Sequence, residues 1–254
     1  MNLEQHIRER LKKKPVLVMS HLICGYPSLD DNRQMLQIMH DAGVDLVEFQ
    51  FPFSEPSADG PVFTRANQKA LDAGTRVADC FELMAWASSK FSFMPVMMGY
   101  TNTVIQYGED AFCQKIAACG GRALIIPDHP PEEDTQLLAA AKAHGLCVIM
   151  LMTPTNTDER LHTLGTKASG FVYGVARRGV TGAKTAFDTG VATCIDRYRH
   201  ATSLPLAIGF GISSSDDVAF LKGRAEIAVV GTAFLTAWET SGPDAAKQLL
   251  AALT

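Results

Sequence analysis

The sequence predicts a closed (β/α)8 barrel. Short apolar runs recur along its 254 residues, and a more polar segment follows each of them. The runs are rich in Val, Ile, Leu, Met and Phe, a composition typical of parallel strands that are buried on both faces. No linker or shift in composition divides the chain, which favours one closed barrel. We expect a single domain over residues 1–254, with strands at 16–23, 45–50, 93–98, 122–126, 146–152, 169–173, 204–208 and 226–230.

The segments between these runs have helical patterns. Ser28 and Asp31, which follow Pro27, have the spacing of a capping box, and Met35 and Met39 then continue at helical intervals. Further helices are expected over about 2–13 before the first strand, over 131–144 between Pro130 and Gly145, and after a cap formed by Ser213 and Asp216.

The alternative fold is a doubly wound open sheet. Such sheets often carry G-x-G-x-x-G after the first strand, and this sequence has no such motif there. Its Gly209-Phe210-Gly211 turn instead follows the seventh expected strand, where barrels commonly hold a phosphate group. The position of this turn favours the barrel.

Composition excludes several classes of protein. The chain is 47% apolar, which excludes intrinsic disorder, and its net charge of −4 provides no general attraction for nucleic acid or anionic lipid. An anionic small molecule remains a possible substrate because backbone N–H groups bind anions without basic side chains. We expect no nucleic-acid partner and no membrane association.

The cysteines and the N-terminus indicate a cytoplasmic protein. The six cysteines contain no C-x-x-C pair and are expected to be reduced. No apolar run reaches the ~18 residues of a membrane-spanning helix. Lys12, Lys13 and Lys14 precede the apolar stretch 16–24 as in a signal peptide, but His21 interrupts that stretch and no small-residue cleavage site follows.

Glu48 is the first candidate for chemistry. It lies in the second expected strand between Val47 and Phe49, where lost hydration raises the pKa of a carboxyl group. A pKa near neutrality suits a group that donates and accepts a proton. A buried structural ion pair would explain the same pattern, so both interpretations stay open at this point.

Asp59 lies in the loop that follows this strand. It precedes Gly60-Pro61, a sequence typical of a tight turn. Turn formation alone accounts for an aspartate there, so the position by itself does not indicate catalysis.

Two features indicate an anion site at the carboxyl ends of the later strands. The glycine turns Gly209–Ile212 and Gly231–Ala233 follow strands seven and eight, and the second opens a helix whose N–H groups can bind phosphate. A long loop over 174–188 carries Arg177 and Thr181 and is expected to be a lid over the anion. A solvated surface loop is the alternative for that segment.

Other chemistries lack their residues. The expected strands contain no Lys for a Schiff base, and the seven histidines show no H-x-H or H-E-x-x-H spacing. We therefore expect neither an imine-forming aldolase nor a metal site.

Taken together, these motifs resemble the tryptophan synthase α-subunit family. The signature is Glu48 followed by Pro52-Phe53-Ser54-x-Pro56-x-Ala58-Asp59-Gly60-Pro61. Matching motifs follow in order: Gly25-Tyr26-Pro27, Tyr100-Thr101-Asn102, Asp128, Arg177-x-Gly179-Val180-Thr181-Gly182-Ala183, Gly209-Phe210-Gly211-Ile212-Ser213 and Gly231-Thr232-Ala233.

The resemblance implies a barrel lyase that cleaves indole-3-glycerol phosphate to indole and glyceraldehyde 3-phosphate without a cofactor. It also implies docking on a β subunit in an α2β2 complex. By matching position, Glu48 is the general acid and base, and Asp59 accepts a hydrogen bond from the indole N–H. The remaining implied site residues are Tyr173 beside the pocket, Gly182, Phe210, Gly211, Gly231 and Thr232 at the phosphate, and Arg177 and Thr181 in the lid.

The sequence departs from the family pattern around the indole pocket. Gln50 stands where Gly is usual, and strand alternation places it on the same face as Glu48, where its amide is expected to bond Glu48 or crowd the substrate. His21-Leu22-Ile23 replaces an aromatic–x–Thr pattern, and Glu55 replaces a common Asp. Two alternative functions follow: a weakly active subunit that mainly activates its β partner, and a stand-alone lyase for a related phosphorylated substrate.

Overall fold

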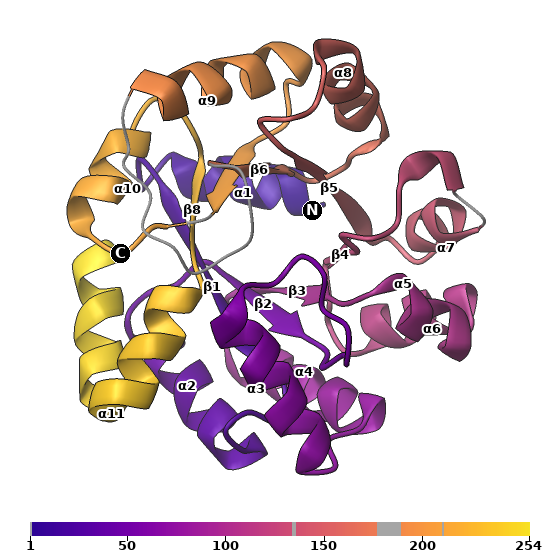
Figure 1. Ribbon diagram of the computed structural model, residues 1–254, viewed down its shortest axis with the longest axis vertical. Coiled ribbons are helices and arrows are strands. Elements are labelled where there is room, and N and C mark those ends of the chain that lie inside the picture. Colours follow the sequence, from indigo (N-terminus) through magenta and orange to yellow (C-terminus); the bar gives the residue numbers. More distant parts are fainter. Residues whose placement is uncertain (1, 134–135, 177–188, 210) are drawn as a thin grey trace.

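The computed structural model describes residues 2–133, 136–176, 189–209 and 211–254. Eight parallel strands form a closed barrel in the order β1 to β8, and helices surround it (Figure 1). This confirms the predicted fold class. The strands are β1 (Leu17–Ile23), β2 (Leu46–Gln50), β3 (Met94–Met98), β4 (Ala123–Ile125), β5 (Cys147–Met152), β6 (Val172–Val175), β7 (Leu206–Gly209) and β8 (Ile227–Val230).

More helices are present than one per strand. Two helices instead of one connect β2 to β3, and two connect β3 to β4. The α-helices are α1 (Leu3–Leu11), α2 (Leu29–Asp41), α3 (Pro61–Asp72), α4 (Val77–Lys90), α5 (Thr101–Tyr107), α6 (Glu109–Ala118), α7 (Leu137–Ala143), α8 (Asp158–Lys167), α9 (Thr189–Ala201), α10 (Ser215–Leu221) and α11 (Thr232–Leu253), and α11 is kinked at Gly242.

The predicted helix starts are partly confirmed. Ser28 caps α2 by accepting the Asp31 N–H, whereas α10 is capped by Ser214 and Asp217, one residue later than predicted. The Asp217 side chain accepts the backbone N–H of Ser214, and this bond completes the capping box of α10. The helix predicted over 131–144 is described as a 3-10 turn at Pro131–Glu133 and the shorter α7.

Side chains alternate between the barrel interior and the helix layer. Leu46 on β2 belongs to the inner core with Met19 and Val96, whereas Val47 and Phe49 belong to the outer core between strands and helices. Because successive side chains on a strand point to opposite faces, the even-numbered residues of β2 point inward. This pattern places both Glu48 and Gln50 inside the barrel.

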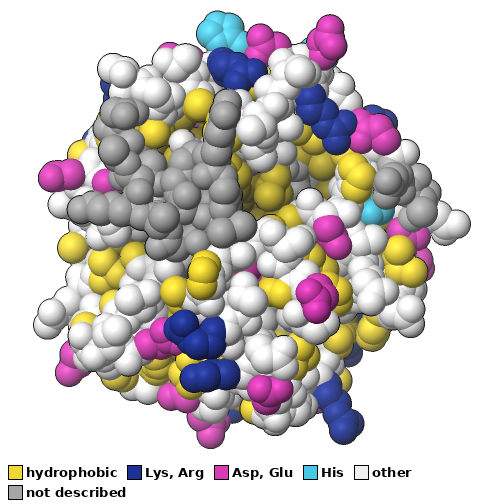
Figure 2. Space-filling model, viewed as in Figure 1, with side chains coloured by type: hydrophobic (Ala, Val, Ile, Leu, Met, Phe, Trp, Pro, Cys, Tyr) yellow, Lys and Arg dark blue, Asp and Glu magenta, His cyan; other side chains and the backbone are white. Residues whose placement is uncertain are grey.

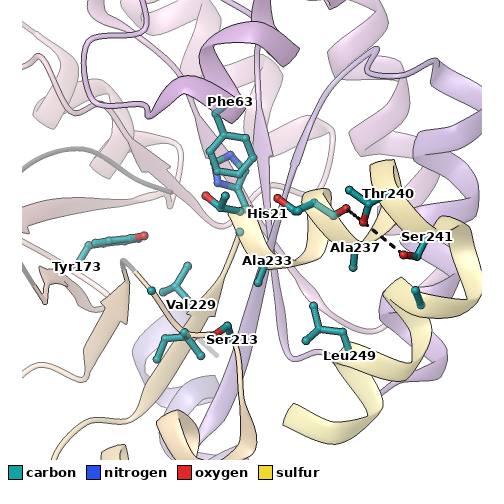
Figure 3. A pocket seen from close by; sticks show the side chains of 16 residues that line it. His21, Phe63, Tyr173, Ser213, Val229, Ala233, Ala237, Thr240, Ser241 and Leu249 are labelled. Atoms are coloured by element: carbon teal, nitrogen blue, oxygen red, sulfur yellow. Dashed lines mark hydrogen bonds between the residues drawn. The ribbon is translucent and has the colours of Figure 1, made fainter. Parts of the chain in front are cut away.

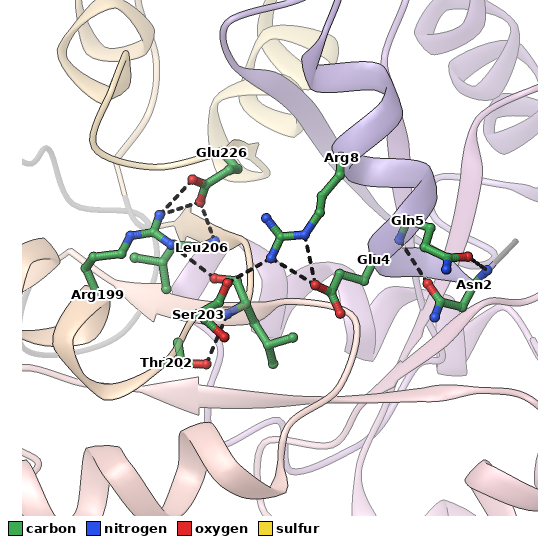
Figure 4. Close-up of polar contacts among 10 residues, drawn as sticks. Asn2, Glu4, Gln5, Arg8, Arg199, Thr202, Ser203, Leu206 and Glu226 are labelled. Atoms are coloured by element: carbon green, nitrogen blue, oxygen red, sulfur yellow. Dashed lines mark hydrogen bonds and ion pairs between the residues drawn. The ribbon is translucent and has the colours of Figure 1, made fainter.

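Helix α1 closes the amino end of the barrel. Its Leu3 and Ile7 are buried in the inner core. Arg8 binds the Ser203 carbonyl oxygen ahead of β7 at 2.8 Å (Figure 4). Arg10 binds Asp45 ahead of β2 at 3.0 Å. The helix is therefore tied to the segments that enter the strands, so the opposite, carboxyl end is the end available for a site.

An ion pair holds the neighbouring part of the amino end together. Arg199 on α9 binds both carboxylate oxygens of Glu226, and the N–H of Leu206 donates to the same carboxylate at 2.7 Å (Figure 4). These bonds join α9, β7 and the residue that precedes β8. They fix the strands whose carboxyl ends carry the glycine turns.

Two smaller predictions concern the cysteines and membranes. All six cysteines are free. None of the helices in the described part of the chain combines the length and apolar character needed to cross a lipid bilayer.

Candidate active site at the carboxyl end of the barrel

Glu48 lies inside the barrel on β2. Glu48 is 3% exposed, and it pairs in register with His21 on β1. Burial, reinforced by the negative charge of Asp59, raises the pKa of Glu48 to about 8. Its Oε2 atom has no hydrogen-bond partner among the described residues. Near neutral pH, Glu48 is therefore a protonated carboxylic acid with a proton available for transfer.

His21 lines the cavity described below and is the neighbour of Glu48 on the adjacent strand. Its ring packs on Phe63 of α3 with 4.4 Å between centroids, and its Nδ1 lies 3.8 Å from Oε2 of Glu48. Burial lowers the pKa of His21 to about 4, an effect that the Gln50 side chain partly offsets. The imidazole is therefore neutral at pH 7, and its contact with Glu48 joins two uncharged groups.

Asp59 lies in the loop after β2 and is held by three donors. Its Oδ2 accepts from Gln50 Nε2 at 2.5 Å, from the Tyr100 hydroxyl at 3.3 Å and from Asn67 Nδ2 at 3.3 Å. Burial raises the pKa of Asp59 to about 6, while the same three hydrogen bonds act in the opposite direction. At pH 7 the group is ionised, so the two carboxyls of the site are in different protonation states.

Asn67 and Tyr100 keep this loop in place and were not predicted as site residues. Asn67 is fully buried on α3, and its Oδ1 accepts the N–H of Phe53 at 3.0 Å. Tyr100 accepts the N–H of Ala58 at 3.2 Å. A polar residue on the apolar face of α3 was the available signal, because Phe63, Ala66 and Ala70 share that face with Asn67.

A cavity of about 590 Å³ opens beside His21 (Figure 3). Figure 2 shows this face of the molecule hollowed near its centre, with hydrophobic side chains in the hollow. Glu48 does not line this cavity but lies next to His21, which does, and Asp59 lines a second hollow with Ser54 and Arg65. The cavity is lined by His21, Phe63, Tyr173, Gly211, Ile212, Ser213, Val229, Gly231, Thr232, Ala233, Thr236, Ala237, Thr240, Ser241, Ala245 and Leu249.

The glycine turns lie at one side of this cavity. Gly231 is the N-cap of α11 and provides no side-chain bond to the first turn, where Thr232 and Ala233 also line the cavity. A Cβ atom on Gly231 would lie 3.1 Å from the Phe63 ring, so a larger residue would narrow the cavity. Gly211 has a φ of 110°, a conformation that favours glycine. This side offers backbone N–H groups at a helix N-terminus, the arrangement that binds phosphate.

The predicted site residues divide into two groups. In the first group, Tyr173 interacts electrostatically with Glu48 and Asp59, and it lines the cavity together with Gly211, Gly231 and Thr232. Tyr173 projects from β6 into the cavity, and its phenol pKa is raised by burial and by the nearby carboxyls. The residues predicted for the lid and for part of the phosphate site, which are Arg177, Thr181, Gly182 and Phe210, lie outside the described residues.

The fold and the site define a class of protein. A closed (β/α)8 barrel has a buried acid, an ionised aspartate and a helix N-terminus at the carboxyl end of its strands. This arrangement is typical of barrel enzymes that move protons on a phosphorylated small molecule.

Comparison with known proteins identifies the family. The family model described as tryptophan synthase alpha chain matches residues 7–253. The tryptophan synthase alpha chain of Desulfotalea psychrophila is 44% identical over 253 residues and covers 100% of both chains. That of Desulforapulum autotrophicum is 43% identical over 251 residues, 99% of each chain.

Solved structures agree with this result. A chain of Mycobacterium tuberculosis tryptophan synthase superposes with a TM-score of 0.92 at 33% identity, covering 99% of this chain and 96% of that one. The tryptophan synthase subunit alpha of Legionella pneumophila gives a TM-score of 0.89 at 27% identity, covering 100% and 97%. The chain belongs to the tryptophan synthase alpha chain family. Members of this family are lyases of tryptophan biosynthesis that cleave indole-3-glycerol phosphate and act with a β subunit in an α2β2 complex.

Proposed function

We propose that this chain performs the family's cleavage with Glu48 as general acid and base and Asp59 as the electrostatic partner of the indole ring. The substrate is indole-3-glycerol phosphate, and the products are indole and glyceraldehyde 3-phosphate. The observation that carries the assignment is the burial of two carboxyl groups on β2 and its following loop, Glu48 with an unpartnered Oε2 and Asp59 with three donors on its Oδ2. Burial raises the pKa of both groups, to about 8 and about 6. We also propose that the whole chain acts as one barrel domain.

Glu48 supplies the proton that the reaction requires. The bond between the indole ring and the glycerol phosphate side chain breaks once indole C3 has been protonated, because the ring can then accept the electron pair of that bond. A carboxylic acid with a pKa of about 8 holds this proton at neutral pH. The resulting carboxylate then takes the proton of the side-chain hydroxyl, which becomes the aldehyde, so Glu48 ends the cycle protonated.

Asp59 stabilises the charge that develops on the ring. Protonation of C3 places positive charge on the indole nitrogen, and a fixed carboxylate that accepts the N–H bond stabilises that state more than the neutral substrate. The bonds from Gln50, Tyr100 and Asn67 all reach Oδ2 of Asp59, which fixes the orientation of the carboxylate.

The phosphate group is assigned to the turns at Gly211 and Gly231, with Thr232 at the start of α11. The support is the N-terminus of α11 at the cavity wall, together with the absence of a side-chain cap from Gly231. Gly182 and Phe210 complete this proposed phosphate site, Arg177 and Thr181 belong to the proposed lid, and Tyr173 borders the substrate.

A steady-state assay of indole release tests the proposal. We expect the chain to release indole from indole-3-glycerol phosphate, and a cognate β subunit to stimulate the release many-fold. No release in either condition, combined with activation of the β subunit, would favour a mainly allosteric role. Release without any stable complex in gel filtration would favour a stand-alone lyase. We further propose a cytoplasmic location, which fits the six free cysteines and is testable by cell fractionation.

A further inference from the structure

Gln50 occupies the interior of the barrel between the two proposed catalytic carboxyls. It lies two residues after Glu48 on β2 and is fully buried. Its register partners are Ile23 on β1 and Met98 on β3, so it lies at the last step of the strand, where β2 gives way to the Asp59 loop. In the proposed function this side chain is only one of three donors that orient Asp59.

One end of the Gln50 carboxamide is bonded to Asp59. Nε2 of Gln50 lies 2.5 Å from Oδ2 of Asp59, the shortest of the three bonds to that oxygen. An ionised carboxylate only accepts hydrogen bonds, so the amide nitrogen is the end of Gln50 that faces it. A hydrogen bond to the charged form of an acid favours that form.

The oxygen end of the carboxamide is less well bonded, although the Gln50 side chain interacts with His21 and partly offsets the lowering of the histidine pKa. Oε1 of Gln50 is buried and has no hydrogen-bond partner among the described residues. A half-satisfied buried amide is unfavourable for folding, and an apolar residue of similar size would avoid that cost. Nε2 also lies 3.4 Å from Oδ1 of Asn67, a much longer contact than the one to Asp59, so the bond to Asp59 is the strongest interaction that accounts for a glutamine here.

The surroundings of Asp59 explain why such a bond matters. Burial favours the protonated acid, whereas the proposed mechanism needs an ionised Asp59 at neutral pH. Tyr100 and Asn67 donate to the same oxygen, but both bonds are longer, at 3.3 Å. The other titratable or charged groups near Asp59 are Glu48 on β2 and Tyr173 on β6 inside the barrel, and Arg65 and Lys69 of α3 at the hollow that Asp59 lines. His21 on β1 lies next to Glu48.

We propose that Gln50 is a positioning residue for the cleavage reaction: its carboxamide holds Asp59 ionised and oriented, so that Glu48 and Asp59 act as a protonated acid and a carboxylate at the same pH. The inference rests on the proposed function. It assigns to Gln50 an action through Asp59 and no contact with the reacting atoms.

The test compares Gln50→Met, which keeps the size of the side chain and removes the donor, with the wild-type chain. Gln37→Met is the matched control, because Gln37 also donates to an aspartate, Asp41 at 2.8 Å, on the exposed face of α2. The first measurement is a carbon-13 NMR titration of the Asp59 carboxyl in the full-length chain without substrate, with Asp59→Asn identifying the resonance. We expect the Asp59 pKa to rise by about one unit in Gln50→Met and to stay unchanged in Gln37→Met.

The second measurement is the pH profile of indole release in the complex with the β subunit. In Gln50→Met, we expect the midpoint of the acidic limb, which reports Asp59, to shift to higher pH by about the same amount. The midpoint of the alkaline limb, which reports Glu48, should not change. An unchanged Asp59 titration in Gln50→Met overturns the inference even if the wild type is active. A wild type without indole release refutes the proposed function instead, while the NMR result still decides whether Gln50 controls the ionisation of Asp59. If Gln50→Met fails to fold, Gln50→Gly removes the same donor and is read in the same way.

Discussion

His21 and Glu48 are register partners on β1 and β2, and Nδ1 of the imidazole lies 3.8 Å from Oε2 of the carboxyl. Burial lowers the pKa of the histidine to about 4 and raises that of the glutamate to about 8. Between these values both groups are neutral, so the pair contributes no ionic attraction at pH 7. The two shifts have opposite consequences for the pH dependence of folding.

For His21, we expect folding to become less stable as the pH falls from 6.5 to about 4. In that window the unfolded chain binds a proton at this residue and the folded chain does not, so acid favours unfolding. His21→Phe removes the effect, and its free energy of unfolding should improve relative to wild type as the pH falls. Urea denaturation at pH 7 and at pH 5 measures this difference. The exposed His162→Phe variant is the control, and equal pH dependence in His21→Phe and wild type would contradict the prediction.

For Glu48, the sign is reversed. The folded chain keeps its proton up to about pH 8, whereas the unfolded chain loses it near pH 4.5, so stability falls as the pH rises between these values. Glu48→Gln removes this cost and should be more stable than wild type at pH 8, by an amount of the order of a few kcal/mol. The same denaturation series at pH 5 and pH 8 measures the change. A variant less stable than wild type at pH 8 would show that the folded site favours the ionised form.

We expect Glu48→Gln to fold and to lose indole release. The amide has the size of the acid but no transferable proton, and the loss of a general acid costs about 10²- to 10⁴-fold in rate. The assay is steady-state indole formation in the complex with the β subunit, with circular dichroism to confirm folding. Retained activity would reject Glu48 as the proton donor.

Asp59→Asn should reduce indole release by about 10²-fold or more. The amide cannot supply the negative charge that stabilises the protonated ring, and the main loss is expected in kcat because the charge develops only in the transition state. Steady-state kinetics separate kcat from KM. A change confined to KM would indicate that Asp59 only binds the substrate.

Gly209→Ala should displace Tyr173 and reduce activity. A Cβ atom at residue 209 would lie 2.6 Å from Cζ of the Tyr173 ring, closer than a real contact allows. The ring would have to move within the cavity that it lines. Gly223→Ala is a control for a glycine substitution outside the site: no neighbour lies within 4 Å, and because its φ of 75° disfavours a side chain, its cost should fall on stability and not on indole release. Equal indole release in both variants would show that the position of the Tyr173 ring is not important.

The fold was predictable because parallel strands that are buried on both faces appear in the sequence as short, nearly continuous apolar runs. Each predicted apolar run overlaps a strand, although β6 continues to Val175, beyond the predicted end at 173. The additional helices on either side of β3 were not predicted, because strand spacing alone does not indicate how a long connection is divided. The cap of α10 was placed one residue early, since Ser213 and Ser214 both precede acidic residues at suitable spacing.

For the site, the sequence predicted which face of a strand a residue occupies, but not which residues it contacts from loops and helices. Alternation along β2 correctly placed Gln50 on the face of Glu48. Of the two expectations for its amide, a bond to Glu48 was wrong, because the amide donates to Asp59 instead, and crowding of the substrate stays a prediction. That partner comes from a loop, whose path the sequence pattern does not determine. Asn67 was missed for the same reason: its bonds to Phe53 and Asp59 arise only when α3 packs over the barrel. The single-domain organisation and the roles of the site residues stay predictions.

Leu3 and Ile7 of α1 fill the amino end of the barrel, so the interior is open only at the carboxyl end of the strands. In the proposed reaction, substrate and products would then share the opening at the carboxyl end. A partner bound over that opening would control both the entry of indole-3-glycerol phosphate and the exit of indole.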